Sequence, residues 1–156
     1  MQTLRTVIAI QFAVVVIGLS VDVGASEPRA TRTLGGIAIG ASSGDVKKAL
    51  GEPTDVRHTG DALDPEWHYG EKLTVSFWNR GLHVAEIRSE SPKACTDTGV
   101  CPGATNAAVQ STLGTPVGDG PVSEGSNQYR SVEETCWVDV VVHKGRVSSI
   151  AIKCQP

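Results

Sequence analysis

One segment of this chain occurs twice. Residues 40–53 read GASSGDVKKALGEP, and residues 103–116 read GATNAAVQSTLGTP. Gly, Ala, a hydroxyl residue, Val, Leu, Gly and Pro recur in the same register without a gap. Since a match at a fixed period is typical of a repeated supersecondary unit, we predict one small domain that contains the same unit twice.

Each copy predicts a short helix with both ends marked. Ser42 and Thr105 are suited to the N-cap, because a side-chain hydroxyl can accept a hydrogen bond from a free amide of the first turn. In the first copy, Asp45 adds a capping-box pattern. Gly and Pro then stop each helix. Isolated helices need about 12–15 residues to be even marginally stable, so we expect the strands that follow to hold these helices in place.

The alternation of apolar residues predicts several strands after each helix. In residues 72–78, Leu73, Val75 and Phe77 point to one side, and the residues between them point to the other. Residues 136–143 alternate in the same way, and residues 147–154 form the return strand of a hairpin. These patterns predict an α+β fold: two tandem helix-plus-antiparallel-strand repeats that form one sheet, with the helices packed on one face.

Residues 1–25 have the pattern of a secretory signal peptide. Arg5 precedes a continuous apolar run over residues 7–19, and small residues at 23 and 25 predict cleavage before Ser26. The run is shorter than the roughly 20 residues that a spanning helix needs. We therefore predict a periplasmic or secreted protein, with no lipid-anchor cysteine at the cut and no transmembrane segment after cleavage. The predicted layout is a flexible lead-in over 26–33, repeat 1 over 34–94 and repeat 2 over 95–156, with both repeats in one domain.

An exported chain with an even number of cysteines predicts disulfides. Its four cysteines allow three pairings, of which we favour Cys95–Cys101 and Cys136–Cys154. Cys136 and Cys154 each lie nine residues from Gly145, so a three-residue loop centred there places them opposite each other, and a slip leaves them diagonal. No pair has the Cys-x2–4-Cys spacing of a zinc site, and we predict neither a metal nor a cofactor.

The sequence contains no recognisable catalytic or nucleic-acid-binding pattern. The net charge is −3, with no basic stripe for a nucleic acid. The four histidines have no metal-ligand spacing, and no GxSxG elbow is present. We therefore expect a protein that is not an enzyme. The alternative is a small-ligand-binding or hydrolytic periplasmic protein that uses His68 with Asp61 and Glu66.

The second face of the predicted sheet is the candidate binding surface. Both hairpins place a Trp there, and Trp is a preferred interface anchor because it buries a large area and still donates a hydrogen bond. Two interpretations stay open: a loop such as 59–66 or 117–127 covers the indoles, or the indoles form an exposed binding face. The residues predicted to bind a partner are Trp78, Trp137, Ser76, Asp139, His143, Trp67 and Tyr69.

The motif Gly-x-Ser-x-x-Asp-Val-x-x-x-Leu-Gly-x-Pro, followed by a strand hairpin, resembles the repeat of the β-lactamase inhibitor protein family. It is also similar to the single-copy domain of the small outer-membrane assembly lipoproteins of the SmpA/OmlA type. The resemblance covers residues 35–89 and again about 99–154. It implies a concave sheet that grips a partner protein, with helices behind it. The lipidated cysteine of the lipoproteins is absent, and no enzyme-blocking loop maps onto either copy, so inhibition of a β-lactamase is not implied.

The predicted function is therefore an exported, non-enzymatic protein-binding module of the cell envelope, either an inhibitor-like or an envelope-maintenance factor. Its predicted partner is another envelope or extracellular protein.

Overall fold

The computed structural model describes residues 31–78, 81–118, 124–131 and 135–155. The predicted signal peptide and residues 26–30 of the lead-in lie outside this part of the chain. Thr31 is buried and Thr33 begins the first strand, so the described structure starts inside the predicted lead-in.

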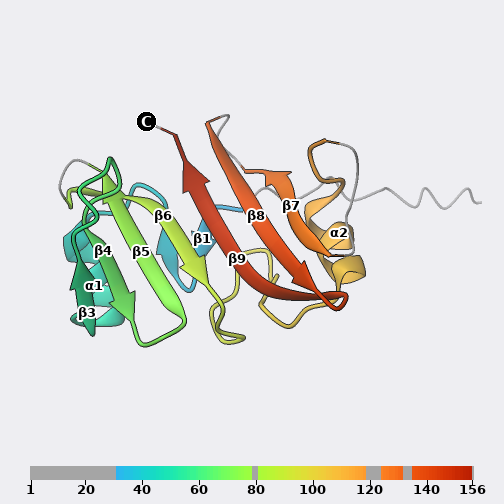
Figure 1. Ribbon diagram of the computed structural model, residues 1–156, viewed down its shortest axis with the longest axis horizontal. Coiled ribbons are helices and arrows are strands. Elements are labelled where there is room, and N and C mark those ends of the chain that lie inside the picture. The colour runs from blue at the N-terminus through green and yellow to red at the C-terminus, as the bar shows by residue number, and fades with distance from the viewer. Residues whose placement is uncertain (1–30, 79–80, 119–123, 132–134, 156) are drawn as a thin grey trace, which may run out of the picture.

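A seven-stranded antiparallel sheet dominates the described residues (Figure 1). Its strand order is β3-β4-β5-β6-β9-β8-β7, so the last strand in sequence lies near the middle and joins the earlier strands to the later ones. The strands are β3 (Asp55–Arg57), β4 (Glu66–Tyr69), β5 (Leu73–Trp78), β6 (His83–Ser89), β7 (Gly125–Arg130), β8 (Cys136–His143) and β9 (Arg146–Cys154). The remaining elements are the two-stranded sheet β1 (Thr33–Leu34) and β2 (Ile37–Ala38), and the helices α1 (Ser43–Leu50) and α2 (Asn106–Leu113).

The predicted fold class, an α+β fold of two tandem helix-plus-antiparallel-strand repeats, is wrong. The described residues are mostly β, with nine strands against two helices of eight residues each. Four strands, β3 to β6, follow α1, whereas three, β7 to β9, follow α2, and the β1–β2 pair precedes α1 alone. The repeated segment specifies a helix and its ends. It does not specify the strands, whose number depends on the apolar alternation further along the chain.

Both helices begin at the predicted N-caps. The Ser42 hydroxyl accepts a hydrogen bond from the Asp45 amide at 3.1 Å, and the Asp45 carboxylate completes the capping box. In α2 the Thr105 hydroxyl accepts from the Ala108 amide at 3.2 Å. Each helix ends at the predicted glycine, Gly51 or Gly114.

Backbone hydrogen bonds attach the start of each helix to a strand. Before α1, the Gly40 amide donates to the Val84 carbonyl at 2.8 Å, and the Val84 amide donates back to Ala41 at 2.9 Å. Before α2, Val147 makes the same two-way pairing with the chain at Gly103 and Ala104. These bonds explain how helices too short to be stable alone are held in the fold.

One face of the sheet packs against the helices and the β1–β2 pair to form the core (Figure 1). Val46 of α1 and Val109 of α2 are fully buried there. Trp67 is only 9% exposed, and its ring lies 4.6 Å from that of Phe77. The strand residues completely buried in this core are Val75, Phe77, Val84, Ile87, Tyr129, Val138, Val140, Val142, Ile150 and Ile152.

The β8–β9 hairpin reaches the predicted cysteine pairing by a different route. Its turn has two residues, Lys144 and Gly145, both with positive φ, as a tight hairpin turn requires. A bulge between Val141 and Val142 then shifts the register by one residue. As a result, Cys136 lies directly opposite Cys154, and the predicted disulfide between them is confirmed.

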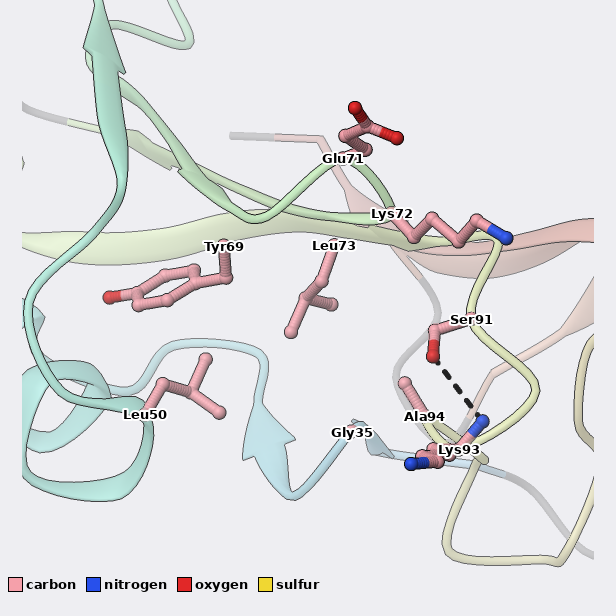
Figure 2. A pocket seen from close by; sticks show the side chains of 9 residues that line it. All are labelled: Gly35, Leu50, Tyr69, Glu71, Lys72, Leu73, Ser91, Lys93 and Ala94. Atoms are coloured by element: carbon pink, nitrogen blue, oxygen red, sulfur yellow. Dashed lines mark hydrogen bonds between the residues drawn. The ribbon is translucent and has the colours of Figure 1, made fainter.

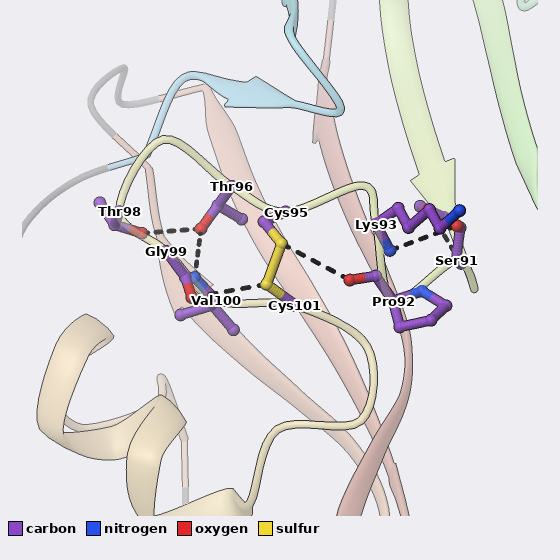
Figure 3. Close-up of a disulfide and its surroundings, with 10 residues drawn as sticks. Ser91, Pro92, Lys93, Cys95, Thr96, Thr98, Gly99, Val100 and Cys101 are labelled. Atoms are coloured by element: carbon purple, nitrogen blue, oxygen red, sulfur yellow. Dashed lines mark hydrogen bonds between the residues drawn. A yellow bond between two sulfur atoms is a disulfide. The ribbon is translucent and has the colours of Figure 1, made fainter.

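The predicted Cys95–Cys101 disulfide is also confirmed, and it closes a compact loop between β6 and α2 (Figure 3). Within this loop, the Thr96 and Val100 backbones are hydrogen bonded at 2.8 Å, and the Val100 amide also donates to the Thr96 hydroxyl at 2.9 Å. The Gly35 amide donates to the Cys95 carbonyl at 3.0 Å, which connects the loop to the β1–β2 pair.

Candidate functional site

The sheet face opposite the helices, here called the open face, carries a row of directly opposed side chains across six strands. The pairing register places these residues next to one another from β4 to β7 in the order Glu66, Ser76, Glu86, Lys153, Trp137 and Arg130. A second row beside it runs His68, Thr74, Arg88, Ala151, Asp139 and Gln128. Directly opposed residues have Cβ atoms about 4.5–5.5 Å apart, so each row forms a continuous surface.

Ion pairs fix the charged side chains in the middle of the open face. Arg88 donates to Glu86 at 2.7 Å, and Lys153 pairs with Asp139. Asp139 also accepts from the Gln128 amide at 3.2 Å. The carboxylates of Glu86 and Asp139 are 15% and 17% exposed, so these pairs are better shielded from water than ordinary surface pairs.

Trp137 is the aromatic centre of the β7–β9 end of the open face. Its half-buried ring has Lys153 opposite on β9, with the ammonium 6.0 Å from the ring centroid, and Arg130 opposite on β7. The Arg130 side chain is exposed and makes no ion pair with the described residues. We call Trp137, Lys153, Arg130, Asp139 and Gln128 the Trp137 patch.

The other residues predicted to bind a partner do not lie together in the structure. Trp78 lies at the end of β5 opposite His83, and its half-buried indole, like that of Trp137, has a buried Nε1 without an acceptor among the described residues. Trp67 and Tyr69 point to the helix side, on the opposite face from Trp137. The structure therefore does not bring Trp67 or Tyr69 together with the Trp137 patch.

His143 lies at the far end of β8, near the hairpin turn. Its ring is 2.5 Å from the Glu124 carboxylate, which also accepts from the Lys144 amide at 2.8 Å. The Lys144 amide and, after it, the His143 ring hold the pKa of Glu124 below its usual value. All three groups are exposed, and the cluster lies at the hairpin turn, at the opposite end of β8 from Trp137.

A cavity of about 320 Å³ occupies the β4–β6 end of the open face. The loop before β4 folds over the strands there, so that the cavity lies between the loop and the sheet. We call it the loop cavity. It is lined by Thr59, Asp61 and Leu63 of the loop and by Glu66, Thr74, Ser76, Glu86 and Arg88 of the sheet.

The loop cavity contains two residues of the alternative site predicted from the sequence, Asp61 and Glu66. His68 lies beside it, with Nε2 2.6 Å from Oε1 of Glu66. The two atoms are within ion-pair distance, but the contact does not have the geometry of a hydrogen bond. Nε2 therefore has no hydrogen-bond acceptor among the described residues. Among the same residues, no group of three or more His, Cys, Asp or Glu side chains is arranged to hold a metal ion.

A larger pocket of about 540 Å³ lies on the helix side of the sheet (Figure 2). Leu50, Tyr69 and Leu73 point toward one another across it, and Lys72 and Lys93 lie at its rim. Burial and, second, the Glu52 carboxylate raise the pKa of Tyr69, whose hydroxyl donates to the Gly51 carbonyl at 3.4 Å. This pocket faces away from the open face and explains the half-buried position of Tyr69.

Sequence reasoning missed the charged partners of Trp137. Lys153 and Arg130 reach the ring only through the order and register of β7, β8 and β9, which periodicity alone does not give. The sequence could have shown that Lys153 points outward. In residues 147–154, Lys153 lies between Ile152 and Cys154, which both point inward.

The two disulfides are typical of an exported protein, which agrees with the export predicted from the sequence. In the described part of the chain, the two helices are too short to cross a membrane.

Comparison with known proteins shows the fold but not a family. The sequence matches no known protein-family model and no curated protein. Similar solved structures include an extracellular protein containing an SCP domain from Bacillus anthracis (TM-score 0.60, 12% identity, 75% of this chain and 44% of that one). A cysteine-rich secretory protein from Staphylococcus aureus is also similar (TM-score 0.59, 11% identity, 82% of this chain and 46% of that one). A DUF4309 family protein from Bacillus subtilis has a TM-score of 0.45 at 19% identity and covers 77% of this chain and 83% of that one.

This chain thus spans less than half the length of the first two structures. At such low identities the likeness is one of fold alone, and it shows that the chain is similar in architecture to part of an extracellular protein and part of a secretory protein.

Proposed function

We propose that this protein is an exported, non-enzymatic binding module of the cell envelope that holds a partner protein on the Trp137 patch. The observation that supports this most is the position of Trp137 between two cationic side chains on an open sheet face. Trp and Arg are the residue types most enriched among those that dominate interface energies.

The Cys136–Cys154 disulfide supports the patch from behind. Cys136 precedes Trp137 in β8, and Cys154 follows Lys153 in β9, so the disulfide joins the two strands directly beneath these side chains. A surface held rigid before binding loses less conformational entropy when the complex forms. This end of the sheet is therefore better prepared for binding than a flexible loop.

The charges of the patch define the chemistry of the partner. Lys153 is already neutralised by Asp139, whereas Arg130 has no carboxylate among the described residues. The expected partner therefore presents a carboxylate for Arg130 next to an apolar group for the indole.

Site-specific photo-crosslinking in the producing cell tests this proposal. A photoreactive residue at Val141, which lies on the open face beside the patch, should capture a partner that the same residue at Lys48 on α1 does not. With the purified partner, Trp137→Ala should weaken binding by at least about 30-fold, the equivalent of a 2 kcal/mol hot spot. Gln110→Ala on α2 is the control and should leave the affinity unchanged. Equal capture from both positions would exclude the patch as the binding surface. A Trp137→Ala variant whose affinity stays within threefold of the wild-type value would exclude it as well.

A hydrolytic function has less support. Ser76 is the hydroxyl residue between two carboxylates in the loop cavity, yet it makes no hydrogen bond with the described residues. A serine nucleophile needs a base within hydrogen-bond reach. The arrangement therefore favours binding in this cavity over hydrolysis.

A further inference from the structure

The loop cavity is lined by a serine that is largely buried and has no hydrogen-bond partner among the described residues. Ser76 is only 6% exposed and lies directly between Glu66 on β4 and Glu86 on β6. Its hydroxyl lines the cavity and makes no hydrogen bond with the described residues. Because this hydroxyl opens into the cavity, its hydrogen-bonding capacity is available to a molecule bound there.

Three carboxylates lie around Ser76, and each contacts its neighbours through only one of its two oxygens. Oδ1 of Asp61 accepts from the Thr59 hydroxyl at 2.9 Å and from the Leu63 amide at 2.8 Å. Oε1 of Glu66 contacts His68, and Oε1 of Glu86 accepts from Arg88. The second oxygen of each carboxylate makes no contact of this kind among the described residues. The cavity is thus lined by oriented carboxylates with free acceptor oxygens.

The charge of the lining favours a cation. The lining has three carboxylates and one guanidinium, that of Arg88, which is already paired with Glu86. Two more cations lie opposite these carboxylates outside the lining, Arg57 opposite Glu66 and Lys153 opposite Glu86, and they are paired with Asp55 and Asp139. The carboxylates are not grouped closely enough to hold a metal ion. A volume of about 320 Å³ is within the range of small-molecule pockets and far exceeds the volume of a single ion.

We propose that the loop cavity binds a small organic cation through its ammonium or guanidinium group. An ammonium group has three donors, which match the free oxygens of Glu66 and Glu86 and the hydroxyl of Ser76. Asp61 of the covering loop and the hydroxyls of Thr59 and Thr74 face the rest of the molecule. This site lies at the other end of the open face from the Trp137 patch and does not depend on the function proposed for that patch.

The cation can come from a free amine or from a basic side chain of a bound protein, and the choice of probes separates these sources. The oxidised mature protein is titrated with 1,4-diaminobutane, Nα-acetyl-lysine amide and Nα-acetyl-arginine amide, while the backbone amides are followed by NMR. We expect saturable shifts at residues 61, 66, 76 and 86. Binding of the diamine alone assigns a free amine as the source, whereas equal or tighter binding of either amino-acid amide assigns a side chain. The uncharged 1,4-butanediol has the same chain and should cause no saturable shift.

Variants then identify the groups that bind. Glu66→Gln and Glu86→Gln should each weaken binding about tenfold or more, because each removes a charged acceptor. Ser76→Ala should weaken it by several-fold up to about tenfold. Glu71→Gln, an exposed carboxylate outside the cavity, is the matched control and should stay within twofold. The absence of saturable shifts in the wild-type protein with all three cationic probes, or equal shifts with 1,4-butanediol, would overturn the proposal without reference to any variant.

Discussion

The Cys136–Cys154 disulfide should contribute more to stability than the Cys95–Cys101 disulfide. The first joins residues 18 apart in sequence, and the second joins residues 6 apart. If a crosslink acts by restricting the unfolded chain, its contribution rises with the length of the closed loop. Loops of these sizes correspond to about 3.2 and about 2.2 kcal/mol at 25 °C. Replacing each pair with alanine should therefore reduce the free energy of unfolding by these amounts.

Burial increases the expected difference. Cys136 and Cys154 are 5% and 9% exposed and share the inner face of the sheet with Val138 and Ile152. Truncation there removes packed atoms from the core, which adds a cavity cost. Cys95 and Cys101 are only half-buried, so the corresponding cost in their loop is smaller.

Urea unfolding followed by circular dichroism and tryptophan fluorescence measures both variants. With a slope of about 1–3 kcal/mol per molar urea, a loss of about 3 kcal/mol moves the midpoint down by about 1–3 M. The reduced wild-type protein, in which both disulfides are open, should unfold at a lower urea concentration than either variant. A loss for Cys95→Ala/Cys101→Ala equal to or greater than that for Cys136→Ala/Cys154→Ala would refute the argument from loop length and burial.

Three further predictions follow from individual contacts. Ser42→Ala should cost about 1 kcal/mol of unfolding free energy, measured by urea titration, because the helix loses its N-cap acceptor; an unchanged midpoint would mean that the cap is not needed. Trp67→Ala should cost about 3–5 kcal/mol in the same assay, whereas Trp137→Ala should cost less than about 1 kcal/mol, because only the first ring is a core residue. His143→Ala should leave the pKa of Glu124 below its usual value in a carboxyl NMR titration, because a backbone amide is the larger cause. This depressed pKa stabilises the fold above the usual Glu pKa, and the effect disappears as the pH falls through the folded value; a return to the ordinary pKa in the variant would contradict the assignment.

Local features of the fold could be predicted because short stretches of sequence determine them. The Ser42 and Thr105 caps and the inward direction of Val75 and Phe77 depend on spacings of two to four residues. The cysteine pairing also followed from one hairpin, although the two-residue turn and the bulge that produce it were not foreseen.

Properties of the whole sheet could not be predicted in this way. The repeated helix motif suggested two equal halves, but the strand count depends on loops and edge strands such as Asp55–Arg57, whose residues are all exposed and carry no periodic signal. Trp67 lies in a four-residue strand between polar neighbours, too short to show which side faces the core. Its inward direction is set by pairing with Val75, a partner that sequence alone does not identify.

The two proposed sites are joined by a narrow seam in the sheet. β6 and β9 share four residue pairs, from Glu86↔Lys153 to Ser89↔Ile150, and among the described residues no other strand pair connects β3–β6 with β7–β9 in the sheet. Ser76 and Trp137 are three strand spacings apart, about 14 Å, and do not share a contact.

Sites this far apart should act independently, so the effects of Ser76→Ala and Trp137→Ala on unfolding free energy should add within about 0.5 kcal/mol. Glu86 and Lys153 face each other across the seam, and each is paired with a residue of its own side, Arg88 or Asp139. Glu86→Gln and Lys153→Met should therefore be non-additive, by about 0.5 kcal/mol or more, in a double-mutant cycle. Additivity at the seam together with coupling between Ser76 and Trp137 would mean that the two halves communicate through the core and not along the open face.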